Sequence, residues 1–292
     1  MKKILGATAL VLLSLFVVGV THFLLLKPQI QDTEIPVMQT PEALIGGERV
    51  GVVVAHDDDY LAAAATLQHL VEQGIEVHYL CLTNHDHHGM AEVRRKETHE
   101  AMNLLKASSV QILDMDLADS SVSYLPIPKE TFADHYDLEL IRSVIEDFVR
   151  EKKPTAIFTL DHEIGGYGHP DHVVVSQTVH DVLQENSDSL ASSLNQIWEI
   201  VYADPLEAYV NGEAAVYLKA MEVYEQPGGM PTPNRAFPVG KFGENRLSLI
   251  RTHASQHNSL KKFFPGYHLY PSWLYNWLYD TEYFRVIGLS DA

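Results

Sequence analysis

The sequence predicts an α/β protein: a Rossmann-like, three-layer domain with a mainly parallel sheet, preceded by one N-terminal transmembrane helix. Three observations support this prediction. Short apolar runs rich in β-branched residues alternate with helical patterns through the first two thirds of the chain, which is typical of parallel βαβ units. Histidines and carboxylates directly follow two of those runs. A long uncharged apolar segment stands near the N-terminus.

The N-terminal segment Ile4–Leu26 has no formal charge and follows Lys2 and Lys3. Its length is sufficient for a helix to cross a bilayer. Because no small-residue cleavage site of the A-x-A type follows it, we expect residues 1–27 to be an uncleaved membrane anchor rather than a signal peptide. The two lysines predict a cytoplasmic N-terminus and an extracytoplasmic domain, and export after signal-peptide cleavage is the alternative.

Residues 28–48 mix prolines, glycines and polar residues as a linker does, and we expect the folded domain over residues 49–292. The first strand is predicted within Val50–Val54, because a run of valines is typical of a strand buried on both faces. The helix that follows, Leu61–Gln73, is rich in alanine and leucine and stops at Gly74. The later elements, in chain order, are a strand over Ile75–Thr83, a helix over Met90–Leu105, a strand over Val110–Met115, a helix over Leu138–Arg150, strands over Thr155–Leu160 and Ile197–Ala203 with a helix over Val173–Gln184 between them, helices over Glu213–Glu225 and Arg246–His257, and an aromatic-rich tail over Phe263–Phe284.

Composition excludes some classes of function. The chain is 46% hydrophobic, which suits a globular core, and its formal net charge is −18. Such a charge argues against binding nucleic acid or an anionic bilayer surface by electrostatic attraction, so we expect no nucleic-acid partner. The only cysteine, Cys81, lies in an apolar run, where we expect a small buried side chain.

Two polar turns carry the expected chemistry. Ala55–Asp59 follows the first predicted strand, and Gly166–His172 lies in the turn after the fourth. In a doubly wound sheet of order 3-2-1-4-5 the first and fourth strands are neighbours, so the two turns meet at the switch point. Histidine and carboxylate ligands without a closing cysteine are typical of a catalytic zinc site with one open position. The sequence therefore predicts a hydrolytic metal centre.

The turn Ala55–Asp59, AHDDD, resembles the AHPDD(E) motif of the LmbE-like, or PIG-L, family of zinc de-N-acetylases. Gly166–His172, GYGHPDH, resembles the GHPDH motif of the same family, which includes the enzyme acting on N-acetylglucosaminyl-phosphatidylinositol. The resemblance runs from about Gly51 to His257. It includes an Arg-x-x-Glu pair that starts at Arg94 and an HxSQ element near the end of that range.

By position, the resemblance implies that His56, Asp59 and His172 hold Zn²⁺. It implies that Asp58 is the general base and that His169 is the acid or oxyanion partner. The expected chemistry agrees with these roles, because zinc activates a bound water, a carboxylate takes its proton, and a protonated imidazole assists the departing amine.

Three further residues receive roles from the resemblance. Asp171 is expected behind His169, Tyr167 over the site, and Arg94 in substrate binding. Each has a structural alternative, since Tyr167 could pack in the core and Arg94 could pair with Glu97 on its own helix. His253 could orient a ligand or end a helix, and the histidines of 85–88 could form a second metal site, although a solvated loop is the better interpretation.

The sequence departs from the family pattern at two positions, with Asp57 where the family has proline and Tyr60 where it often has glutamate. Every expected ligand is nevertheless present. We therefore expect a zinc-dependent N-deacetylase that acts on an N-acetylglucosamine-containing small molecule or glycoconjugate. The alternatives are a zinc amidase acting on a different acyl-amine and an inactive, tethered carbohydrate-binding module.

Overall fold

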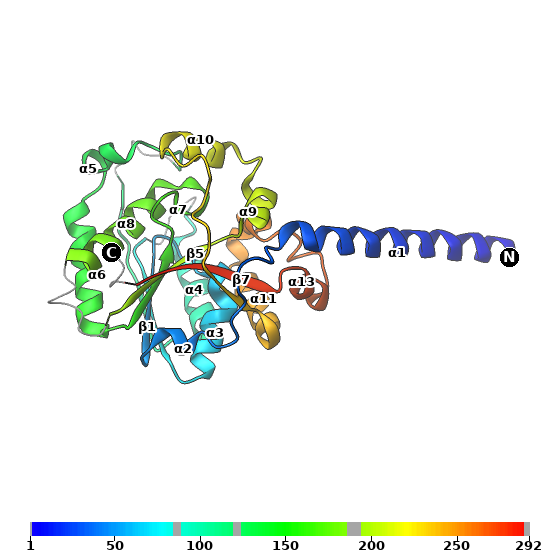
Figure 1. The fold of residues 1–292 in the computed structure, drawn as a ribbon, viewed down its shortest axis with the longest axis horizontal. Coiled ribbons are helices and arrows are strands. Elements are labelled where there is room, and N and C mark those ends of the chain that lie inside the picture. The colour runs from blue at the N-terminus through cyan, green and yellow to red at the C-terminus, as the bar shows by residue number, and fades with distance from the viewer. Residues whose placement is uncertain (1, 84–88, 119–123, 186–193, 289–292) are drawn as a thin grey trace.

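The computed structural model describes residues 2–83, 89–118, 124–185 and 194–288 (Figure 1). The predicted metal-binding alternative for the histidine turn 85–88 lies outside these residues. Within them, one sheet of order β3-β2-β1-β4-β5-β7-β6 forms the centre of the domain. The strands are β1 (Arg49–Val54), β2 (Glu76–Cys81), β3 (Ser109–Ile112), β4 (Ala156–Leu160), β5 (Gln196–Val201), β6 (Arg235–Pro238) and β7 (Thr281–Gly288).

The first five strands are parallel, and their order 3-2-1-4-5 confirms the predicted doubly wound sheet. Val52 on β1 lies opposite Tyr79 on β2 and Phe158 on β4, so β1 is a central strand. Strand β7 extends the sheet by pairing antiparallel with β5, and β6 pairs antiparallel with β7. The carboxyl ends of β1 and β4 therefore lie side by side, as the predicted meeting of the two turns requires.

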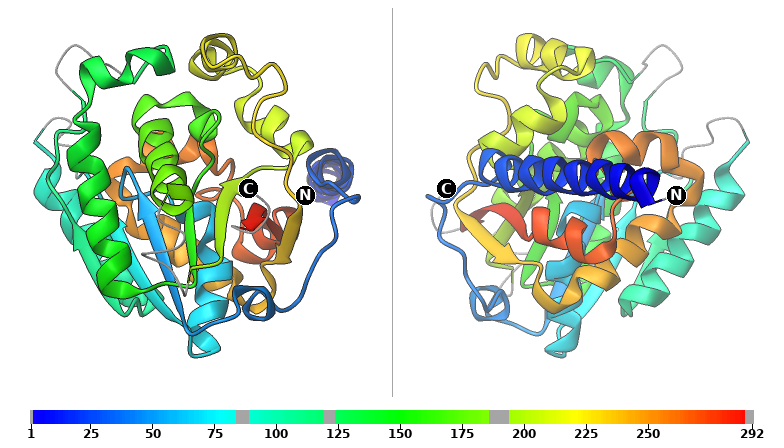
Figure 2. Two further views of the ribbon diagram at one scale, coloured as in Figure 1. Left: turned by 60° about the vertical axis from the view of Figure 1, so that its left-hand side comes forward. Right: turned by 90° about the vertical axis from the view of Figure 1, so that its right-hand side faces the viewer.

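Two hydrophobic cores cover the two faces of the sheet. Successive side chains of a strand point to opposite faces, so Val52 and Val54 pack in one core and Val53 in the other. The first core is closed by α3 (Ala64–Glu72), α4 (Ala91–Leu105) and α11 (Gly243–Thr252). The second is closed by α6 (Leu138–Lys152) and α8 (Pro170–Glu185), which gives the three predicted layers (Figure 2). The remaining helical elements are α1 (Lys2–Ile30), α2 (Glu42–Ile45), α5 (Phe132–His135), α7 (Gly165–Gly168), α9 (Asp204–Asn211), α10 (Ala215–Val223), α12 (His257–Phe263), α13 (Ser272–Leu278) and short 3₁₀ turns at Leu61–Ala63, Lys129–Thr131, Gly240–Phe242 and Ala254–Gln256.

Helix α1 extends away from the domain, and only its C-terminal turns contact it (Figures 1 and 2). Leu26 and Ile30 are buried against Leu278, and Lys27 Nζ lies 2.6 Å from Asp280 Oδ2. No helix in the described part of the chain has both the length and the apolarity that crossing a membrane requires. The predicted single-pass anchor and its topology are therefore wrong: the end of the apolar segment packs against protein.

The segment expected to be a linker is attached to the domain along much of its length. Residues 28–30 belong to α1, Ile35 is buried, and Val37 forms a β-bridge with Ala236 beside the edge strand β6. Ile45 of the short helix α2 is buried in the first core. These contacts replace the expected free tether with a strap along the sheet edge.

Candidate active site

The turn after β1 is built around its own polar groups. His56 and Asp57 are buried directly beyond the strand. Asp59 closes the turn, because its Oδ2 accepts a hydrogen bond of 2.8 Å from the backbone N–H of His56. This bond leaves Asp59 Oδ1 directed toward the neighbouring turn, where it lies 3.1 Å from His172 Nε2.

The turn after β4 is organised by the buried carboxylate of Asp161. Its Oδ1 accepts backbone N–H groups from residues 163–165, and its Oδ2 accepts the N–H of Gly166 at 2.6 Å. Gly168 adopts φ 99°, and a Cβ there would lie 2.2 Å from the Cβ of Ala220, so only glycine fits. The turn thereby delivers His169 and His172 to the start of α8 beside the first turn.

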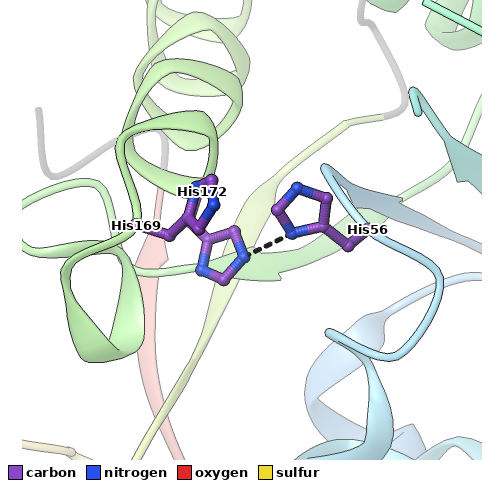
Figure 3. A group of neighbouring side chains, drawn as sticks. All are labelled: His56, His169 and His172. Atoms are coloured by element: carbon purple, nitrogen blue, oxygen red, sulfur yellow. Dashed lines mark hydrogen bonds between the residues drawn. The ribbon is translucent and has the colours of Figure 1, made fainter. Parts of the chain in front are cut away.

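The three predicted metal ligands meet. His56 Nδ1 lies 2.8 Å from His172 Nε2 (Figure 3). The same nitrogen lies 3.8 Å from Asp59 Oδ1. Asp59 Oδ1 also lies 3.1 Å from His172 Nε2. Two ligand atoms that each lie about 2.0–2.1 Å from a tetrahedral zinc are roughly 3.3 Å apart, and the three donor–donor distances lie on either side of this value. His169 offers a further nitrogen within 4.8 Å of those of the other two histidines.

The tautomers of the two ligand histidines follow from their outer partners. His56 Nε2 lies 3.1 Å from Asp171 Oδ2, and His172 Nδ1 lies 2.9 Å from the carbonyl of Gly165. Both outer nitrogens must carry the proton, because their partners only accept hydrogen bonds. The two inner nitrogens therefore point lone pairs at each other across 2.8 Å, and a shared proton or a cation must lie between them. The donor set fits a divalent metal.

Charges around this point favour a cation. Burial lowers the pKa of His172, but the neighbouring carboxylate of Asp59 and its hydrogen bond outweigh burial, so the pKa is raised overall. Asp58 lies beside the ligands with an 18% exposed side chain. Burial, then repulsion from Asp57 and Asp59, raises the pKa of Asp58 to about 7. A carboxyl group of this pKa exchanges protons near neutral pH.

Asp171 supports a ligand rather than the predicted acid. Its Oδ1 accepts a hydrogen bond of 2.8 Å from Tyr136 Oη, and its Oδ2 bonds His56, whereas His169 Nδ1 is 3.9 Å away. A carboxylate behind a ligating histidine fixes the orientation of the ring. His169 Nδ1 instead lies 3.2 Å from the backbone N–H of Asp171, which favours a proton on Nε2.

The site opens into a cavity of about 390 Å³. Asp58, Asp59 and the three histidines line it, and Tyr167 lies beside them with its ring centroid 5.1 Å from that of His172. Tyr167 also packs against Phe263, with centroids 4.5 Å apart, so it joins the turn after β4 to α12. Much of the other wall is apolar and is formed by Ile200, Val201, Val210, Val216, Met230, Phe263 and Phe264.

Comparison with known proteins identifies the domain. The family described as PIG-L: GlcNAc-PI de-N-acetylase matches residues 51–183, which contain both turns and all the candidate ligands. Residues 51–183 form a PIG-L family domain. The resemblance of the two motifs is thereby confirmed.

Relatives of the PIG-L domain differ in their named substrates. A probable N-acetylglucosaminyl-phosphatidylinositol de-N-acetylase of Dictyostelium discoideum is 24% identical over 48% of this chain and 51% of its own length. A mycothiol S-conjugate amidase of Streptomyces coelicolor is 30% identical over 43% of this chain and 48% of its own. The chain thus spans about half the length of the curated relatives it matches.

The fold of the PIG-L domain extends beyond the matched sequence. The N,N'-diacetylchitobiose deacetylase of Pyrococcus horikoshii superposes with a TM-score of 0.58 at 19% identity, covering 86% of this chain and 87% of the other. At this identity the likeness establishes a shared fold alone.

Arg94, for which the resemblance implies substrate binding, lies at the cavity wall and is paired with a carboxylate of the first turn. It lines the cavity of the PIG-L domain but is 8% exposed, and its guanidinium forms an ion pair with Asp57. The HxSQ element lies against the same residues, since Gln256 Nε2 donates to Asp57 Oδ1 at 3.0 Å. Ser255 Oγ donates to Glu97 on α4 at 2.6 Å, so Glu97 binds this element rather than Arg94.

Two features of the structure were not found from sequence. Tyr136 comes from an irregular segment before α6, and no motif marks it as a partner of Asp171. His162, His180 and Glu199 form a second group with metal-binding atoms, outside the two motifs. In that group Arg285 Nε donates to Glu199, so a cationic side chain already balances its carboxylate.

Proposed function

We propose that this protein is a zinc-dependent hydrolase that removes the N-acetyl group from an N-acetylglucosamine-containing substrate. The observation that carries the proposal is the 2.8 Å approach of His56 Nδ1 to His172 Nε2, with Asp59 completing the donor set. Two imidazole lone pairs facing each other at this distance are repulsive unless a positive charge lies between them. The named activities of the relatives support an acetamide or related amide as the bond that is cleaved.

Asp58 would act as the general base of this hydrolase. It lines the cavity beside the three proposed ligands, and its carboxylate accepts no hydrogen bond from the described residues, so its oxygens can take a proton from water. It would take a proton from water as the water oxygen bonds to the amide carbon. A bound zinc would polarise the amide carbonyl and make the water more acidic.

His169 would act on the other side of the reacting amide. With its Nδ1 accepting the backbone N–H of Asp171, the neutral ring would carry its proton on Nε2 and donate a hydrogen bond from there to the developing oxyanion. The proton that Asp58 takes from the water would pass to the departing nitrogen. The carbon–nitrogen bond then breaks, and acetate and a free amine leave. Asp171 and Tyr136 would keep the His56 ring in place through these steps.

A panel of amides tests the substrate assignment. Acetate release should be measured with zinc-loaded protein on N-acetylglucosamine, N,N'-diacetylchitobiose and an alkyl N-acetylglucosaminide, with N-acetylcyclohexylamine as the sugar-free control. Hydrolysis of the sugar substrates alone is the expected result. Equal hydrolysis of the sugar-free amide would favour the alternative, an amidase acting on other acyl-amines, for which the 30% identical mycothiol S-conjugate amidase is the supporting observation.

A further inference from the structure

Asp57 is the most enclosed carboxylate of the metal-binding turn. It is 0% exposed and lies between the ligand candidate His56 and the base candidate Asp58. Arg94 donates to both of its oxygens, and Gln256 Nε2 donates to Oδ1 at 3.0 Å. Thr98 Oγ1 lies 3.2 Å from Oδ2. Both oxygens of Asp57 therefore accept hydrogen bonds from protein side chains, and Asp57 does not line the cavity.

Asp58 stands in contrast to its neighbour. Among the residues that the structure describes, no donor forms a hydrogen bond with its carboxylate. The guanidinium of Arg94 lies nearby, with its Nη2 3.9 Å from Asp58 Oδ1, just beyond hydrogen-bond range. One guanidinium therefore stands between two adjacent carboxylates and bonds only one of them.

The position of Arg94 decides whether the oxygens of Asp58 are free to accept a proton. A guanidinium presents its N–H groups as a rigid fork that matches a carboxylate, and the resulting pair is strong when it is buried. If Arg94 bonded Asp58 in this way, the oxygens that must receive the proton of the attacking water would already be occupied. Asp57 prevents this, because its more deeply buried carboxylate binds the guanidinium of Arg94 instead.

We propose that Asp57 is a positioning residue that holds Arg94 away from Asp58 and so leaves the base free for water. The position of Arg94 relative to the two carboxylates does not depend on the proposed function, whereas the expected effect on turnover rests on it. Arg94 pairs with Asp57 while it lines the cavity. Its charge is used within the turn, and the HxSQ residue Gln256 supports the same pair from the opposite side.

Three variants test the inference by kinetics: Asp57→Asn, Arg94→Leu and the double variant. In Asp57→Asn the amide keeps the size of the side chain but releases one guanidinium bond, so Arg94 should move to Asp58. We expect kcat to fall about 100-fold with KM changed less than about threefold, since a general base contributes roughly 10²–10⁴-fold. The double variant, which has no guanidinium to misplace, should recover kcat to within about tenfold of wild type.

The recovery distinguishes positioning from general damage. If Asp57 only stabilised the fold, removing Arg94 as well would lower kcat further or leave it unchanged. The double variant carries no unpaired buried charge, so it remains informative even where Asp57→Asn does not fold. A double variant with kcat 100-fold below wild type overturns the inference. The matched control is Asp114→Ala, which removes the ion-pair partner of Arg95 on the same helix, away from the cavity.

A second readout does not depend on activity. In a crystal structure of Asp57→Asn, the distance from Arg94 Nη2 to Asp58 Oδ1 should shorten from 3.9 Å to about 3 Å. An unchanged Arg94 overturns the inference. If the wild-type protein releases no acetate from any substrate, the proposed function fails, and this distance together with the zinc content of the variants still decides whether Asp57 holds the guanidinium.

Discussion

The different roles proposed for the adjacent residues Asp58, the base, and Asp59, the metal ligand, give the sharpest test of the site. Asp59 Oδ1 is 3.1 Å from His172 Nε2, whereas Asp58 accepts no hydrogen bond from the described residues and is not among the converging donors. Asp58→Asn should therefore leave zinc bound and should not lower the free energy of unfolding, because burial and the neighbouring carboxylates disfavour the ionised form of Asp58. Because the amide is not basic, kcat should fall by roughly 10²–10⁴.

Asp59→Asn should behave differently. The substitution removes a charged donor, and Asp59 Oδ2 also holds the backbone N–H of His56. Zinc affinity should fall, with part of the activity restored by excess zinc. The assay is acetate release from N,N'-diacetylchitobiose on protein whose zinc content has been measured by mass spectrometry. Equal zinc loss in both variants, with equal rescue by added zinc, would refute the separation of base from ligand.

The other predictions concern the ligands, their support and the buried histidine of the HxSQ element. His172→Ala should lose zinc, and full occupancy in metal analysis would contradict its role. Tyr136→Phe removes a hydrogen bond to Asp171 and should lower kcat about tenfold or less with zinc retained, and an unchanged kcat would argue against support of His56. Burial lowers the pKa of His253 from 6.5 to about 4, so the unfolded chain binds the proton first. Above pH 6.5 the histidine is neutral in both states and does not affect the free energy of unfolding. As the pH falls from 6.5 toward 4, protonation of the unfolded chain lowers the free energy of unfolding by about 3 kcal/mol. His253→Gln should lose that much less stability between pH 7 and pH 4 in urea unfolding, and equal losses would contradict the assignment.

The parallel part of the sheet was predictable because four of its five strands, β1, β2, β4 and β5, are largely buried and therefore appear in the sequence as apolar runs. The pairing of β1 with β4 then follows from the doubly wound order, which places the two motifs together. Strands β6 and β7 were not predicted. Strand β7 lies in the aromatic tail and includes the buried Glu282, whose carboxylate accepts the N–H groups of Ala65 and Thr66 at the start of α3. A buried charge of this kind depends on tertiary contacts that a periodicity does not reveal.

The error at the N-terminus and the unforeseen pairing of Arg94 with Asp57 have the same physical origin. Hydropathy describes the segment before Lys27 as if it were isolated, whereas Leu26 and Ile30 bury their surface against Leu278. Likewise, the sequence shows that Arg94 and Asp57 are both charged but not that their side chains meet across the core. Local patterns predict which residues are polar, and the fold decides which of them are paired.

The central claim is that one metal ion held between the two turns is required for deacetylation. The most direct measurement is a titration of metal-stripped protein with Zn²⁺, with acetate release from N,N'-diacetylchitobiose as the signal. The account predicts negligible activity without metal and a rise that reaches its plateau at about one Zn²⁺ per chain. Full activity in the stripped protein, or no acetate release at any zinc concentration, would contradict it.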